Sequence, residues 1–196
     1  MIKMEEAFLR FDSFNQLDPS EIIWNGQHYP SEYFYALRLY EWVKKLEPNA
    51  SEPLLLASRS QHIGRWEIDR KTYPDGRSGY LRWRSDLAKF HAKKAIEILQ
   101  SLEYDNYIIT RVTEIILKKK LKMDSEVQTM EDALCLVFLQ FQYDDLIKKQ
   151  TAEKMIAILQ KTWAKMSDKG KQVAMSLTYS SSGQQLLEKA ITKKPL

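Results

Sequence analysis

The stretch Thr129-Met-Glu-Asp-Ala-Leu-Cys-Leu-Val-Phe-Leu-Gln-Phe141 decides the fold class of this chain. After its polar start, apolar side chains occupy most sides of a helix, which indicates a helix at the centre of a core. Cys135 lies among these apolar residues, so we expect an inert core thiol. This helix and the next should contribute five buried side chains, which are Val137, Phe138, Phe141, Ile156 and Trp163.

Apolar residues at helical spacing continue on both sides of this stretch. Residues 67–79 are predicted to form a long loop, because Tyr73-Pro-Asp-Gly-Arg-Ser-Gly79 contains two turn signals. Before the first long helix we expect a turn at 15–20, a short helix from Asp18, and at most a short hairpin near Trp24–Tyr29. The predicted longer helices are 31–46, 51–64, 79–102, 105–119, 129–141, 151–166, 168–176 and 184–192.

The length and composition favour one all-α domain. A chain of 196 residues suits a single compact domain, and six glycines and six prolines are too few for a turn-rich β fold. We predict a helical core at about residues 30–150, followed by additional C-terminal helices at about 151–192. Helix content should be well above half.

The chain shows no secretory or membrane signal. It has one cysteine, its N-terminus carries no long apolar stretch, and no run approaches the ~20 apolar residues that span a bilayer. These features predict a cytoplasmic protein without a membrane span. The net charge of +4 is too small to indicate nucleic-acid binding by itself.

The arginines are concentrated in one part of the chain. Six of the nine lie within 26 residues, and four lysines follow at 118–120 and 122. A solvated surface explains many such clusters. However, the planar fork of arginine suits phosphate and carboxylate better than lysine does, so the bias toward arginine indicates anion recognition. The six arginines are Arg59, Arg65, Arg70, Arg77, Arg82 and Arg84.

Three residues that can carry chemistry stand at ends or faces of predicted helices. They are His62, His91 and Asp132. In a local interpretation, Asp132 stabilises a helix start, His62 a helix end, and His91 is a satisfied buried group. In the alternative, distant helices bring two imidazoles and a carboxylate together, as a divalent-metal site or an acid/base group.

Much of the chain, from about residue 30 to 170, is similar to an uncharacterised family, domain-of-unknown-function family 4202. The resemblance implies no established activity. The segments that carry it are Arg59-Ser-Gln-His-Ile-Gly-Arg-Trp-Glu-Ile68, Gly79-Tyr-Leu-Arg-Trp-Arg84, Phe90-His-Ala92, Val127-Gln-Thr-Met-Glu-Asp132 and Lys161-Thr-Trp-Ala-Lys-Met-Ser167.

The chain also resembles, more weakly, the HD-domain phosphohydrolases, an all-helical family that holds divalent metal with histidines and aspartates. Asp132 and the apolar run after it resemble that family's last metal helix, and His91 resembles the extra histidine of its longer members. The His-Asp pair reads Gln61-His62 here, and Tyr35 and Lys118–Lys119 stand near other ligand positions. The resemblance therefore implies an HD-like fold with at most one loosely held ion.

We interpret the chain as a divergent HD-like domain that binds a phosphorylated small molecule or nucleotide and includes metal-dependent phosphohydrolase chemistry among its candidate activities. His62, His91 and Asp132 are the candidate catalytic groups and metal ligands. The alternative is a non-catalytic module that binds RNA or a protein through the basic 65–84 loop and Lys118–Lys122. The predicted anion-binding residues are Arg59, Arg65, Arg77, Arg84, Lys118 and Lys119.

Overall fold

A computed structural model describes residues 2–192 of the chain. Helix accounts for 72% of these residues, so the predicted all-α class is confirmed. The chain forms two compact units, residues 1–120 and residues 121–196, and each is described by itself. The organisation as a single domain stays a prediction. Within residues 2–192, no helix combines the length and the apolar character that a bilayer span requires.

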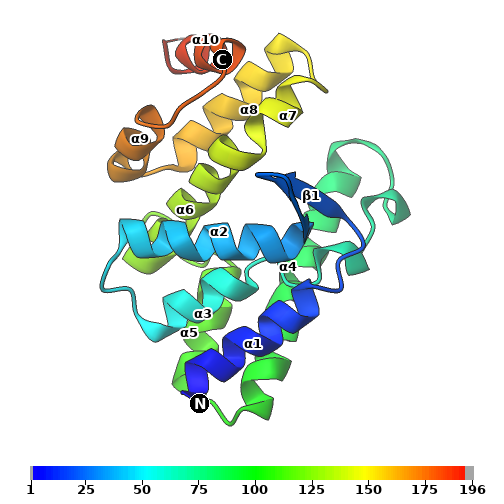
Figure 1. Cartoon of the computed structure of the whole chain (residues 1–196), viewed down its shortest axis with the longest axis vertical. Helices are drawn as coiled ribbons and strands as arrows, with labels where there is room; N and C mark the ends of the chain where they lie inside the picture. The colour runs from blue at the N-terminus through cyan, green and yellow to red at the C-terminus, as the bar shows by residue number, and fades with distance from the viewer. Residues whose placement is uncertain (1, 193–196) are drawn as a thin grey trace. The chain divides into compact units, whose positions relative to one another are not determined.

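The first unit consists of helices and one small hairpin, which packs against α2 (Figure 1). Helix α3 packs against α1, α2 and α5, and α4 packs against α1 and α5. Buried aliphatic and aromatic side chains such as Phe34, Leu56 and Ile115 fill the space between them. The elements are α1 (Lys3–Asn15), β1 (Glu21–Trp24), β2 (Gln27–Pro30), α2 (Ser31–Leu46), α3 (Glu52–Ser60), the short helices η1 (Arg65–Glu67) and η2 (Arg70–Thr72), α4 (Gly76–Ser101) and α5 (Asn106–Ile116).

The first thirty residues correct two of the predictions. Helix α1 was not expected, although it buries Ala7 and Phe11 completely. The short helix predicted from Asp18 is wrong, because Asp18 makes tertiary contacts instead. Its carboxylate accepts from the backbone N–H of Ser20 at 2.9 Å and from that of Glu32 at 2.9 Å. Asp18 therefore links the entrance of β1 to the first turn of α2.

The predicted hairpin is confirmed. Strands β1 and β2 pair antiparallel, with Ile23 opposite His28. Asn25 and Gly26 have φ values of 50° and 77°, and positive values at both central residues are typical of the tightest hairpin turns.

The loop predicted at 67–79 contains two short 3₁₀ helices, and α4 begins three residues earlier than expected, at Gly76. Side chains of α4 hold this segment in place. The indole Nε1 of Trp83 donates to the carbonyl of Ile68 at 2.9 Å, and the Tyr73 hydroxyl donates to Asp86 at 3.0 Å. The segment before α4 is therefore fixed against the same helix that carries Arg84.

The second unit is built on α6. That helix begins at Ser125 rather than Thr129, because the Asp124 carboxylate accepts from the backbone N–H groups of Glu126 and Val127 and caps the helix. Helix α7 was not predicted, and α10 starts three residues early. The elements are α6 (Ser125–Phe141), α7 (Tyr143–Ile147), α8 (Ala152–Lys165), α9 (Asp168–Met175) and α10 (Ser181–Thr192).

The predicted core residues of this unit are confirmed in part. Val137 and Cys135 are buried. The other four, Phe138, Phe141, Ile156 and Trp163, are only half-buried, so that prediction is wrong for them.

The buried side of α8 is instead formed by Met155 and Leu159, which lie four residues apart and are almost completely buried. Helix α8 therefore buries one face, as predicted, but this face is rotated about the helix axis from the one that was expected.

Candidate functional site

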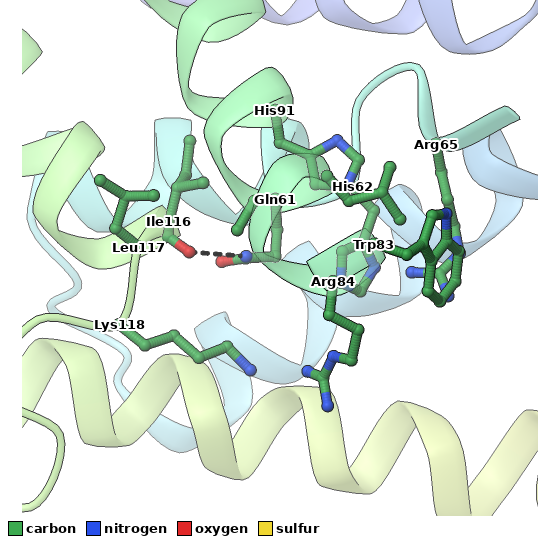
Figure 2. A pocket seen from close by; sticks show the side chains of 11 residues that line it. Gln61, His62, Arg65, Trp83, Arg84, His91, Ile116, Leu117 and Lys118 are labelled. Atoms are coloured by element: carbon green, nitrogen blue, oxygen red, sulfur yellow. Dashed lines mark hydrogen bonds between the residues drawn. The ribbon is translucent and has the colours of Figure 1, made fainter. Parts of the chain in front are cut away.

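A pocket of about 110 Å³ lies within the first unit, between the end of α3, η1, the middle of α4 and the end of α5. Figure 2 shows how the side chains of these four segments surround it. Trp83 and a few aliphatic side chains form its apolar part. Its polar lining consists of Gln61, His62, Arg65, Arg84, His91 and Lys118.

His62 and His91 lie together, as one interpretation of the sequence predicts. Their ring centroids are 5.7 Å apart. The Nδ1 of His91 is 2.8 Å from the carbonyl oxygen of Ile63. Because a carbonyl oxygen only accepts, this Nδ1 must carry the proton and donate it.

Both imidazoles are held neutral. Burial, together with a smaller effect of the nearby charge of Arg65, lowers the pKa of His91 to about 4 despite the opposing effect of the bond to Ile63. Burial also lowers the pKa of His62 well below its ordinary value, and the charges of Arg65, Lys118 and Arg84 and the neighbouring His91 add to this. At neutral pH, His91 therefore carries its single proton on Nδ1 and presents Nε2 as an acceptor.

Three cations come to this pocket from three segments. The guanidinium of Arg65 lies 5.3 Å from the ring centroid of Trp83 and its Nε is 3.7 Å from a carboxylate oxygen of Glu32. Arg84 lies over Tyr80, one turn earlier on α4. In Figure 2 the ends of the Arg84 and Lys118 side chains extend toward the same side of the pocket. Burial is the main cause of the lowered pKa of His62, and the positive charges of all three side chains lower it further.

Lys118 reaches the pocket from an unusual backbone position. The N–H of Lys118 bonds to the carbonyl of Ile115, and the N–H of Lys119 to that of Glu114, which is the Schellman ending of a helix. In that ending, the residue after the C-cap adopts a left-handed conformation and is usually glycine. Lys118 has φ 53°, which a side chain disfavours by about 1–2 kcal/mol.

Comparing Lys118→Gly with Lys118→Ala isolates this strain, since both variants lose the amine and every contact it makes. We expect the glycine variant to be more stable than the alanine variant by about 1 kcal/mol. Urea denaturation measures the difference. Equal stabilities would show that the left-handed turn is not maintained in solution.

Gln61 is a pocket residue that the sequence analysis did not single out as a site. Its position just before His62, at the end of an apolar helix, was the only available signal. Its Nε2 donates to the carbonyl oxygen of Ile116 at 3.1 Å, as Figure 2 shows. The residue is 4% exposed, and its Oε1 has no hydrogen-bond partner among the described residues.

Three of the predicted anion-binding residues lie outside the pocket lining. Arg59 pairs with Asp12 and lies over the rings of Phe8 and Tyr40, so it ties α3 to α1 and α2. Arg77 and Lys119 are exposed. Trp66 stacks on Phe14.

Asp132 belongs to the second unit, where its carboxylate has local partners. It accepts from the backbone N–H of Ser167 at 2.8 Å, from the Ser167 hydroxyl, and from Nε2 of Gln128 at 3.0 Å. Because α6 begins at Ser125, Asp132 lies inside that helix and not at its start, as the local interpretation expected. Its bonds to Ser167 stabilise the start of α9 instead. Its convergence with the two histidines stays a prediction.

The described residues do not fit a metal ion well. Among residues 2–192, no group of three or more histidine, cysteine or acidic side chains is arranged to hold one. The two imidazoles of the pocket stand beside three cations, which repel a divalent ion and attract an anion.

Comparison with known proteins places the chain in a family without an assigned activity. No curated protein and no solved structure matches the chain, so the HD-like arrangement stays a prediction. The profile of the family described as "Domain of unknown function (DUF4202)" matches residues 5–187, and the chain therefore belongs to that family.

Proposed function

We propose that the pocket binds the phosphate group of a phosphorylated small molecule or nucleotide. The observation that carries this proposal is the set of three cations, Arg65, Arg84 and Lys118, around one small pocket that also holds two neutral imidazoles. A guanidinium group can donate two parallel hydrogen bonds to two oxygens of one phosphate, and these hydrogen bonds are strengthened by the opposite charges.

The size of the pocket limits which part of the ligand enters it. Pockets that enclose a whole small molecule measure about 300–1,000 Å³. This pocket, at about 110 Å³, suits a phosphate group, and the remainder of the ligand would lie outside it. The guanidinium of Arg65 lies over the ring of Trp83, and the indole N–H of Trp83 donates to the carbonyl of Ile68. We therefore assign Trp83 to positioning Arg65 rather than to stacking on a base.

Hydrolysis of a bound phosphoester is the candidate reaction within this proposal. The cations would stabilise charge that develops on the phosphoryl oxygens. His62 is the candidate base, because its lowered pKa keeps it neutral and no carbonyl within residues 2–192 holds its ring, whereas His91 is oriented by Ile63. A cytoplasmic location is part of the same proposal and suits a chain whose single cysteine is a buried thiol outside any disulfide.

Calorimetric titration with inorganic phosphate and with a nucleoside monophosphate tests the proposal. Arg84→Ala should weaken binding about tenfold or more, because a charge-assisted bond contributes about 1.5–3 kcal/mol. Lys119→Ala is the matched control: it removes the same charge from an exposed site outside the pocket and should change affinity by less than about twofold at fixed salt.

Two results would contradict the proposal. The first is an absence of phosphate binding at millimolar concentration. The second is an equal loss in both variants, which would mean that surface charge alone attracts the anion. That second result would favour the alternative function, a basic surface that binds RNA or a protein.

A further inference from the structure

The oxygen of Gln61 is a fixed hydrogen-bond acceptor in the pocket. Its amide nitrogen is bonded to the carbonyl of Ile116, and rotating the amide by half a turn would place two oxygens against each other. The orientation is therefore determined. Oε1 is buried and has no partner within residues 2–192, and leaving such an acceptor unsatisfied costs about 1–3 kcal/mol.

His91 supplies a second acceptor of fixed orientation. Its Nδ1 donates to Ile63, so the remaining ring nitrogen, Nε2, carries only a lone pair. Gln61 and His91 both line the pocket that the cations surround. A ligand that satisfies both the cations and these two acceptors is an anion that also brings a hydrogen-bond donor.

We propose that the pocket selects an oxyanion that retains a proton, with inorganic phosphate or the monoanion of a phosphate ester as the class of ligand, over a fully deprotonated one such as sulfate. The selection rests on the proposed function, in which the cations Arg65, Arg84 and Lys118 bind the oxyanion. Gln61 supplies the discrimination: its Oε1 accepts from the P–O–H group and would repel an unprotonated oxygen in the same place.

Phosphate and sulfate form a matched pair of probes. Both are tetrahedral and of similar size, but at pH 7 inorganic phosphate retains at least one proton and sulfate retains none. A site that rejects a ligand by leaving its own polar group unpaired can discriminate strongly. We expect phosphate to bind the wild-type chain at least about tenfold more tightly than sulfate in calorimetric titrations at equal ionic strength.

The outcomes separate this inference from the proposed function. Equal affinities for phosphate and sulfate would overturn the inference and leave the proposed anion site standing. Binding of neither anion would remove the proposed function, and the inference with it. This comparison uses the unaltered protein, so it does not depend on whether any variant folds.

Gln61→Met then tests the residue. Methionine has a similar length but no amide, so the ratio of phosphate to sulfate affinity should fall toward one. Lys118→Ala is the control, because loss of a cation should weaken both anions alike and leave the ratio unchanged. A tenfold preference that persists in Gln61→Met would overturn the assignment to Gln61.

Discussion

Replacing Asp132 with alanine is expected to lower the free energy of unfolding by about 3–4 kcal/mol. The carboxylate is buried and accepts three hydrogen bonds, two of them from Ser167. Removing it leaves the backbone N–H of Ser167 without its acceptor at the start of α9, and bonds to a charged group contribute about 1.5–3 kcal/mol each. Chemical denaturation gives the loss, and amide exchange at Ser167 should show where it arises.

Asp132→Asn is the control for this prediction. Asparagine keeps one oxygen that accepts from the Ser167 N–H and loses the charge, so it should cost about half as much as alanine. A loss below about 1 kcal/mol in Asp132→Ala would contradict a structural role for Asp132 and favour its prediction as a catalytic group.

Gly64→Ala is expected to destabilise the first unit by about 3 kcal/mol. Gly64 has φ 68°, where a side chain is strained, and it lets the chain turn between His62 and Arg65. A Cβ added here would also lie 2.8 Å from ring carbons of both Phe14 and Phe90. Strain of about 1–2 kcal/mol and overpacking of about 1–3 kcal/mol should add.

Gly26→Ala separates the two contributions. Gly26 has a similar φ of 77°, but nothing lies within 4 Å of the position its Cβ would take. It should therefore show the backbone strain alone, and Gly64→Ala should cost at least about 1 kcal/mol more in urea denaturation. Equal losses in the two variants would contradict the tight packing of the two phenylalanine rings around Gly64.

Local signals in the sequence were enough to predict the helices that have clear ends. Pro30 precedes α2 and Pro48 follows it, so the bounds 31–46 could be predicted correctly. The start of α6 could not be predicted correctly, because Asp124-Ser125 is typical both of a turn that separates two helices and of a helix cap. Only the bonds that Asp124 accepts decide between the two.

The candidate site was predictable only in part, because its parts meet through tertiary packing. The pairing of His62 with His91 follows from the packing of α3 and α4, which no local spacing specifies. An excess of arginine indicated an anion, but only the structure shows that Arg59 pairs with Asp12 whereas Arg65 and Arg84 line the pocket. The unpartnered oxygen of Gln61 appears only when every buried polar atom is matched to its partners.

The histidine rings offer the most direct test of phosphate binding in this pocket. The chain has three histidines, and His28 lies exposed on the hairpin beside Glu21, so it serves as an internal control. Positive charge helps to lower the pKa of His62. A bound phosphate neutralises part of that charge, so the pKa of His62 should rise and the ring should take up a proton at a higher pH.

The decisive measurement is therefore an NMR titration of the three histidine rings with pH, with and without saturating phosphate. We expect His62 to titrate at a higher pH when phosphate is present and His91 to respond in the same direction, whereas the ring of His28 should not respond to phosphate. Identical titrations of His62 and His91 in both conditions, or a shift of His28 as large as theirs, would contradict a phosphate site in the pocket.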